Sequence, residues 1–326
     1  MKTSGVKKVL NTKYITLLIL LAVIIAFYGI AAEASGAGVF FSLTNLRNIF
    51  NSMVIVGLLT IGAGCLIISG NIDLSAGYVG SLCGVFVAHL STILGLSWPL
   101  ALIGVLVTGA LFGVFNAFLV NQLKLQAFIA TLATGYIADG LIYSISPSGT
   151  IVLDDPVLNW LGSGRIGPFL PVAIVIEIVL FIVYGIMLAK TKFGRSVYLV
   201  GGNPAASRLA GLKPKRISFI LFVNSAVLSS LAGVLLTARL KSSTIFGIKQ
   251  SNFAGVTAAI LGGVSFSGGA GGMGGAFLGL LIINSFTNGM SVMKISSYYQ
   301  TIASGLLLLF ALFLDYATSR FDKKKV

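Results

Sequence analysis

Ten stretches of this chain are uncharged or nearly so, and most are long enough to cross a lipid bilayer as a helix. A helix needs about 20 apolar residues to span roughly 30 Å of hydrocarbon. Because 56% of the 326 residues are hydrophobic and only 9% are charged, a soluble core could not hide the apolar surface. The sequence therefore predicts an all-α polytopic membrane protein with about ten transmembrane helices.

The shortest of the ten stretches is the eighth, Gly255–Val264 with its flanks. Cys65 and Cys83 lie within apolar runs and are expected to pack as free thiols rather than in a disulfide or a metal site. The other expected spans are Tyr14–Ala32, Phe50–Ser69, Leu74–Leu94, Pro99–Val120, Ala127–Ile145, Phe169–Ala189, Ile217–Ala238, Met273–Met290 and Tyr298–Leu314.

Positive charges on the loops predict the orientation. An even number of spans puts both termini on one side. The Lys and Arg on the opposite side are Arg47, Arg165, Arg239, Lys241, Lys249 and Lys294. The other sixteen of the 22 share the side of the termini, which the positive-inside rule assigns to the cytoplasm. We therefore expect cytoplasmic tails at residues 1–13 and 317–326 and a cytoplasmic loop at 190–216. The net charge of +14 serves topology, and no nucleic-acid partner is expected.

An internal similarity indicates two inverted halves. Residues 123–135 align without gaps with residues 293–305, and Lys124 aligns with Lys294. Lys124 would begin its span from the cytoplasm and Lys294 from outside, so the two copies run in opposite directions. Inverted repeats are typical of transporters. The expected halves are residues 14–168 and 169–316, with about five spans in each.

The basic loop Thr191–Arg216 is expected to contain one short, capped helix. Asn203 suits its N-cap, Pro204 its first helical position, and Ala205–Ala210 its interior. Gly211 suits the left-handed position at its end. At about 8 residues, such a helix is below the roughly 12 to 15 at which isolated helices become marginally stable in water. We therefore expect another protein to pack against it.

Polar and flexible residues interrupt two apolar runs at Ser69–Gly77, and they include Asn71, Asp73 and Ser75. An ionised Asp at the bilayer centre costs about 2.5 to 3.5 kcal/mol. Asp73 is therefore expected at the cytoplasmic membrane edge or in a wet interior. Two interpretations stay open: Asp73 caps the third span and shapes a gate, with Ser75 nearby, or it caps the helix in a simple turn.

The glycine-rich run Gly262–Gly275 resembles a phosphate-binding loop. However, the chain contains no Gly-Lys dipeptide, so ATP binding through a P-loop is excluded. These glycines are instead expected to let the eighth and ninth spans approach closely. The candidates for helix packing are Gly268, Gly269, Gly271, Gly272, Gly275 and Gly279.

One His and eight acids offer few means of catalysis. His89 has no neighbour at ligand spacing and is expected to be a packing or interface residue. Asp139 and Glu177 fall within the outer parts of spans, where they either line an extracellular vestibule or stay hydrated at the interface. No nucleophile and base can be paired, so we expect neither an enzyme nor a metal site.

Three motifs, in their order and spacing, resemble those of the permease subunits of bacterial ABC importers. They are Gly70-Asn-Ile-Asp-Leu-Ser75, Gly194-Arg195 with the Gly201–Gly211 helix, and Leu261-Gly-Gly-Val-Ser-Phe-Ser-Gly-Gly269. The nearest group is the ribose-type simple-sugar permeases, which are related to the branched-chain amino-acid permeases. The likeness extends from about Leu43 to Leu314.

This resemblance implies a multi-pass subunit of the bacterial inner membrane that imports a sugar. The implied partners are ATPase subunits that carry ATP and Mg, a substrate-binding protein over Ser146–Gly167, and a second permease copy or a paralogue. No cofactor is expected on this chain. The residues implied in coupling to the ATPase are Gly194, Arg195, Gly201, Gly202, Asn203, Pro204, Ala205, Ala206, Arg208 and Gly211.

Two positions depart from the family pattern. The coupling segment often has Glu before its paired alanines, where this chain has Pro204, so Arg195 or Arg208 would supply charge instead. Relatives often carry an acidic run before Ala254, whereas Lys249–Phe253 is basic and polar. Substrate contacts of the family therefore cannot be transferred to that segment.

A neutral sugar needs hydroxyl, amide and aromatic contacts. Candidates for a path or gate are Asn71, Asp73, Ser75, Asn284, Phe286 and Asn288. Two other functions stay open. A branched-chain amino-acid importer would need a charge partner for its zwitterion. An ion-coupled secondary transporter is compatible with an inverted repeat, but the few intramembrane acids and the docking helix argue against it.

Overall fold

The computed structural model describes residues 3–34, 39–147, 149–167 and 170–323, which are mostly helical. The elements are α1 (Thr3–Ala34), α2 (Leu43–Ile68), α3 (Ala76–Ala88) with a π-helical turn (His89–Ile93), α4 (Trp98–Asn121), α5 (Ala127–Ile145), α6 (Pro156–Ser163), β1 (Arg165–Ile166), β2 (Leu170–Pro171), α7 (Val172–Lys190), α8 (Lys192–Gly202), α9 (Pro204–Leu209), α10 (Pro214–Leu240), α11 (Ser251–Leu261), α12 (Met273–Val292) and α13 (Ser297–Lys323).

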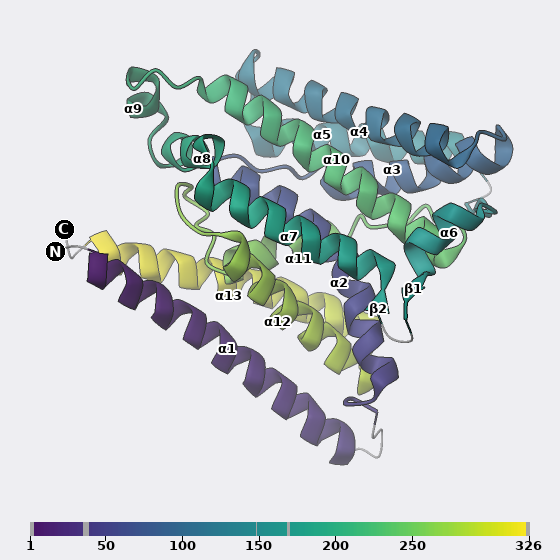
Figure 1. Cartoon of the computed structure of the whole chain (residues 1–326), viewed down its shortest axis with the longest axis horizontal. Coiled ribbons are helices and arrows are strands. Elements are labelled where there is room, and N and C mark those ends of the chain that lie inside the picture. The colour runs from purple at the N-terminus through teal and green to yellow at the C-terminus, as the bar shows by residue number, and fades with distance from the viewer. Residues whose placement is uncertain (1–2, 35–38, 148, 168–169, 324–326) are drawn as a thin grey trace.

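The two ends of the helix bundle carry different elements (Figure 1). Helices α8 and α9 lie at one end, where α1 begins and α13 ends; we call it the α9 end. Helix α6 and the strands β1 and β2, which pair antiparallel, lie at the other, which we call the α6 end. The loop expected to face the cytoplasm and the loop expected to face outside are therefore at opposite ends.

Within the described residues, nine helices are long and apolar enough to cross a membrane. They are α1 to α5, α7, α10, α12 and α13, and they confirm nine of the expected spans. The predicted start of the sixth span, Phe169, lies outside the described residues. Helix α2 begins at Leu43 rather than Phe50, because the hydroxyl of Ser42 accepts the N–H of Asn45 at 3.1 Å and caps it.

The eighth crossing differs from the prediction of a full helix. Helix α11 has 11 residues, and at 1.5 Å per residue it covers only about half of the hydrocarbon. The irregular segment 241–250 precedes it and descends beside α3. Ser243 donates its N–H to the carbonyl of Ile151 at 2.8 Å, and Ile248 donates to the hydroxyl of Ser81 at 2.9 Å. These irregular backbone N–H groups are thus hydrogen-bonded within the protein, as is required where no water is present in a membrane.

Helices α2 and α10 form the centre of the molecule. They pack on each other, and α10 also packs on α3 and α4. Most of α2 is buried, whereas α1 and α13 are mostly exposed. In a membrane, such exposed apolar helices face lipid or another subunit.

The aligned lysines Lys124 and Lys294 share an unusual backbone conformation. Their φ angles are 58° and 57°, in the left-handed region that non-glycine residues rarely adopt. Each lies three residues before a helix, α5 and α13 respectively. The packing agrees, because α5 packs on α3 and α13 on α11, while α3 packs on α10 and α11 on α2. An inverted repeat produces such pairings. The inversion and the boundary at residues 168–169, which lie outside the described residues, stay predictions.

Glycines let α11 and α12 approach until their backbones touch. A Cβ at Gly275 would overlap the carbonyl oxygen of Gly262, and a Cβ at Gly279 would overlap that of Ala258. The close approach expected of the eighth and ninth spans is therefore confirmed at these two positions.

We expect Gly275→Ala to lower the thermal stability of the protein. The new methyl group meets backbone, which cannot rotate away, and overpacking of this kind costs about 1 to 3 kcal/mol. The matched control is Gly305→Ala on α13, where a Cβ has no neighbour within 4 Å and the change is neutral or stabilising. The measurement is the temperature at which the monodisperse peak in detergent is lost. An equal loss in both variants would contradict the packing argument.

Candidate functional site

The basic loop between α7 and α10 folds into two helices, not one. The side chain of Asn203 caps α9 by accepting the N–H groups of Ala205 at 3.1 Å and Ala206 at 2.9 Å. Pro204 is the first residue of α9, and Gly211 follows it with φ of +81°. The predicted capped helix is confirmed, although it has six residues. Helix α8, which precedes it, was not predicted.

Helix α9 is exposed on nearly every side. Ser207 is its only buried residue, and the predicted coupling residues Ala205, Ala206 and Arg208 are all exposed. Leu209, which the sequence analysis did not single out, is 91% exposed. A fully exposed leucine beside alanines is an apolar surface with no cover in this chain. In the sequence, this surface was signalled only by an apolar residue, Leu209, in the last turn of a very short helix.

Helix α8 sits directly on the ends of other helices. Its buried residues are Gly194, Val197 and Val200. The hydroxyl of Thr191 accepts the N–H of Gly194 at 3.0 Å and caps the helix. A Cβ at Gly194 would overlap the carbonyl oxygen of Met187. The first turn of α8 is therefore held tightly against the end of α7.

Backbone groups from three segments meet at one point, which we call the Gly201 junction. A Cβ at Gly201 would overlap the carbonyl oxygen of Ile68, the last residue of α2. The same oxygen accepts the N–H of Gly269 at 2.8 Å. The φ angles of Gly268 and Gly269 are +82° and +73°, which glycine adopts readily. The junction thus joins α8, α2 and the loop 262–272 without side chains.

A tyrosine fastens the same loop to α8. Tyr198 donates its hydroxyl to the carbonyl of Gly271 at 2.9 Å. Burial raises the pKa of Tyr198 above its ordinary value, so the hydroxyl stays protonated and keeps donating. Gly271, expected to pack helices, instead has φ of +116° and shapes this loop, and Gly272 has open space around it.

Asp73, expected at the cytoplasmic membrane edge or in a wet interior, lies in a buried polar network. It is 2% exposed and accepts the N–H and hydroxyl of Ser75 at 2.9 and 2.6 Å and the hydroxyl of Ser225 at 3.0 Å. Asn116 donates to the hydroxyl of Ser75 at 2.8 Å and accepts the hydroxyl of Thr134 at 2.6 Å. The network fixes the start of α3 to α4, α5 and α10. The N-cap position of α3 is Ser75 itself.

The other path candidates lie elsewhere. Asn71 is half-buried and donates to the hydroxyl of Ser69 at 3.3 Å. On α12, Asn284 donates to the carbonyl of Leu280 at 3.0 Å, and the ring of Phe286 lies edge-on to Tyr28 of α1.

Asn288 and Asn45 exchange two amide hydrogen bonds of 2.9 Å, which tie α12 to α2. The candidates on the α2–α3 turn and those on α12 are therefore two separate groups. Their role in a path stays a prediction.

The two outer acids have different surroundings: Glu177 fits neither the vestibule nor the hydrated interface, whereas both interpretations of Asp139 stay predictions. Glu177 on α7 is fully buried beside Gly57 of α2, and it has no hydrogen-bond partner among the described residues. Asp139 on α5 forms an ion pair with Lys249, and the Lys249 amine lies 5.2 Å from the centre of the Tyr143 ring. The basic residue that departs from the family pattern thus has an acid partner within this chain.

The remaining reactive side chains are packed as expected. His89 stacks on Phe86, and Cys65 and Cys83 are buried and free. In the part of the chain that the structure describes, no three His, Cys, Asp or Glu residues gather as metal ligands. The cluster that stands out is therefore at the α9 end. There, the predicted residues Gly194 to Gly211 and the glycines Gly268, Gly269 and Gly271 come together.

Comparison with known proteins gives consistent matches. The family model described as "Branched-chain amino acid transport system / permease component" matches residues 45–312. The xylose transport system permease protein of Haemophilus influenzae is 29% identical over 98% of this chain and 99% of its own length. The ribose import permease protein of Bacillus subtilis is 34% identical over 83% and 84%.

The L-arabinose transport system permease protein of Escherichia coli is 33% identical over 85% of this chain and 84% of its own length. No solved structure matches the chain. The matched region begins within the first turn of α2 and covers every helix from α3 to α12, including α8 and α9.

Proposed function

The chain belongs to the family of branched-chain amino acid transport system permease components, and we propose that it is the membrane subunit of an ATP-driven importer for a sugar. The observation that carries this proposal is the set of relatives, named for xylose, ribose and arabinose and matched over more than four fifths of their length. The chain is a transport subunit and not an enzyme. ATP and Mg are bound and used on a separate ATPase subunit.

The ATPase binds at the α9 end. Helix α9 is short, capped and exposed, and its surface is formed by Ala205, Ala206 and Leu209 with Arg208 beside them. Small residues let a partner approach closely, and an exposed leucine offers an apolar anchor. Arg195 and Arg208 make the site positively charged, which suits an acidic surface on the partner. This end faces the cytoplasm, in line with the positive-inside rule.

Movement of α9 reaches the bundle through the Gly201 junction. Helix α8 continues into α9 at Asn203, and its last turn touches the end of α2 and the loop that leads into α12. When the ATPase closes, it displaces α9 and α8 as one lever. Because the contacts at Gly201, Ile68 and Gly269 are backbone on backbone, the displacement passes to α2 and α12. This tilts the spans and alternates access to the two sides.

A substrate-binding protein docks at the α6 end. Within Ser146–Gly167, leaving residue 148 aside, Asp155 caps α6 and Trp160 exposes about half of its surface. Exposed tryptophan is enriched at binding surfaces. This loop lies at the end of the bundle opposite α9 (Figure 1), so the binding protein and the ATPase act from opposite sides of the membrane.

A second permease copy or a paralogue completes the path. Helices α5 and α13 leave Tyr136, Tyr298 and Tyr299 strongly exposed, although tyrosine hydroxyls are poorly placed against lipid tails. Tyr136 lies 5.9 Å from Tyr78 of α3, centre to centre. Such rings can stack on the apolar face of a sugar, and their hydroxyls can bond its polar rim. Facing a second copy, these helices would add aromatic rings and hydroxyl groups to a path between the two subunits.

The test is transport in proteoliposomes that contain this chain, its ATPase and its binding protein. We expect ATP-dependent uptake of radiolabelled ribose, xylose or arabinose and no uptake of leucine. Uptake of leucine instead would assign the chain to amino-acid import. Sugar uptake in vesicles without the ATPase would show a secondary transporter and overturn the proposal.

A further inference from the structure

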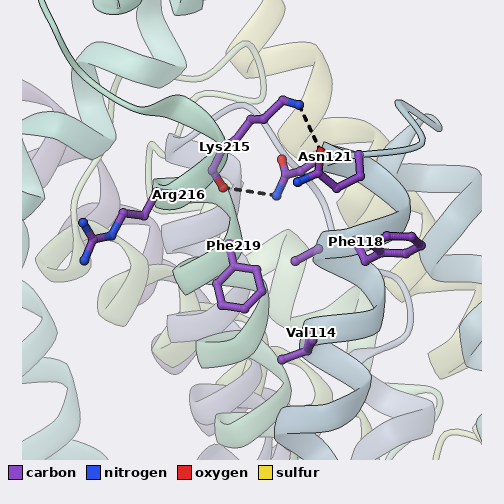
Figure 2. A pocket seen from close by; sticks show the side chains of 8 residues that line it. Val114, Phe118, Asn121, Lys215, Arg216 and Phe219 are labelled. Carbon is purple, nitrogen blue, oxygen red and sulfur yellow. Dashed lines mark hydrogen bonds between the residues drawn. The ribbon is translucent and has the colours of Figure 1, made fainter.

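A cavity of about 310 Å³ opens between the end of α4 and the start of α10. Its apolar lining consists of Val114, Ala117 and Phe118 from α4 and Phe219 from α10. Asn121 and Gln122, with Lys215 and Arg216, form its polar rim. In Figure 2, Val114 and the rings of Phe118 and Phe219 lie below Lys215, with the Phe118 ring on the flank of α4 that points away from Phe219. The cavity is thus apolar on one side and basic on the other.

The cations of this rim have no acid partner. Lys215 donates from its amine to the side-chain oxygen of Gln122 at 3.3 Å, and its carbonyl accepts from the amide of Asn121 at 3.2 Å. No acidic residue lines the cavity. The side chain of Arg216 points to the other flank of α10 in Figure 2, from which its long, flexible stem can reach the rim. At the rim an anion would therefore find the Lys215 amine and two amides, with the Arg216 guanidinium on the neighbouring flank of α10.

The apolar and basic parts of the cavity follow each other as the hydrocarbon and headgroup layers of a lipid bilayer do. Val114, Phe118 and Phe219 are between 39% and 48% exposed on helices long and apolar enough to span a membrane, so they are accessible to an acyl chain. The cations lie at the α9 end, beyond the last turn of α4 and in the first turn of α10. Positive side chains just above an apolar groove, on the predicted cytoplasmic side, meet the leaflet whose lipids are anionic.

We propose that this cavity binds an anionic phospholipid, with its phosphate at Lys215 and Arg216 and an acyl chain over Phe118 and Phe219. The phosphate oxygens accept from the amine, the guanidinium and the amide of Asn121. Free phosphate shares this headgroup chemistry, but it leaves the apolar half of the cavity unused. The ATPase would have to reach below the membrane surface to fill that half.

The site has a consequence for coupling. Only residues 210–213 separate α9 from Pro214, the first residue of α10. A lipid held at Lys215 and Arg216 therefore anchors the start of α10 next to the proposed ATPase site. The bound lipid would resist inward movement of α10 while α8 and α9 move.

The experiment uses a tryptophan reporter. Phe219→Trp places a fluorophore in the cavity, whereas Trp98 and Trp160 belong to α4's first turn and to α6 at the far end. The full chain is reconstituted in phosphatidylcholine vesicles with rising fractions of phosphatidylglycerol brominated on its acyl chains. Bromine quenches only tryptophan that it contacts. A parallel series uses brominated phosphatidylcholine.

We expect Phe219→Trp to be quenched preferentially by phosphatidylglycerol. Adding Lys215→Gln and Arg216→Gln should weaken this preference roughly 30-fold, at about fivefold per cation near the surface. The matched control combines Phe219→Trp with Lys192→Gln and Lys213→Gln. It removes two charges from the same end, but neither residue lines the cavity, and the preference should persist.

Three outcomes would overturn the proposal. Equal quenching by both brominated lipids would show that the cavity does not recognise the anionic headgroup. Relief of quenching by inorganic phosphate, beyond that caused by sodium chloride of equal ionic strength, would assign the site to a free anion. An unchanged lipid preference in the double variant, together with loss of ATPase co-purification, would assign the two cations to the ATPase. Lys215→Gln alone repeats the test if the double variant is not monodisperse.

Discussion

Ala206→Arg should abolish co-purification of the chain with its ATPase and the stimulation of ATP hydrolysis by the binding protein. Ala206 is exposed in the middle of α9, and its N–H already bonds Asn203. The arginine therefore leaves the helix and its cap intact and projects into the partner. An uncompensated buried charge costs several kcal/mol and an overpacked contact about 1 to 3 kcal/mol, so we expect association roughly 100-fold weaker or more.

Two variants of the same helix calibrate this result. Ala206→Ser adds one oxygen without charge, and it should keep association close to wild type. Leu209→Ser removes an apolar side chain that contacts little in its own chain, and burial of a leucine contributes about 1.5 to 3 kcal/mol. It should weaken association by an intermediate factor. If Ala206→Arg keeps the ATPase bound and active, α9 is not its docking site.

Gly201→Ala should separate ATP hydrolysis from transport. The new methyl group overlaps the carbonyl oxygen of Ile68, which already accepts from Gly269 at 2.8 Å. The junction must open, while α9 and its exposed surface stay as they are. Coupling between distant sites is typically worth about 1 to 3 kcal/mol, or 5- to 150-fold. We expect sugar uptake per ATP hydrolysed to fall within that range while the ATPase still co-purifies.

The neighbouring residue supplies the control. A Cβ at Gly202 would lie 3.9 Å from the Cα of Gly269, an ordinary contact. Gly202→Ala adds the same methyl group to the same helix, and we expect this variant to transport normally. Retained ATPase binding shows that Gly201→Ala is folded. Normal uptake per ATP in Gly201→Ala would mean that movement of α9 reaches the membrane-spanning helices by another route.

What could be predicted from the sequence was local. The caps of α9 follow from Asn203, Pro204 and Gly211 alone, because each acts on backbone groups a few residues away. The spans follow from apolar length. Helix α8 could not be predicted, because Gly194, Gly201 and Gly202 lower helix propensity. It forms because those glycines fit against Met187, Ile68 and Gly269, and such contacts are made only by the whole fold.

The missed features at membrane depth have the same cause. The hydrogen-bond network of Asp73 could not be predicted, because its partner Ser225 lies 152 residues away along the chain. The eighth span was expected to be a full helix because composition does not show that Ser81 and Ile151 bond the segment 241–250. Leu209 was overlooked because its importance lies in its exposure, which only the structure supplies.

The ion pair between Asp139 and Lys249 has a consequence for biogenesis. The lysine follows the aspartate by 110 residues, so at about 5 to 20 residues per second the ribosome needs roughly 5 to 20 s to supply it. During that interval α5 carries an acid that insertion machinery disfavours. Until the lysine arrives, the unpaired acid therefore disfavours release of α5 from the translocation channel into lipid.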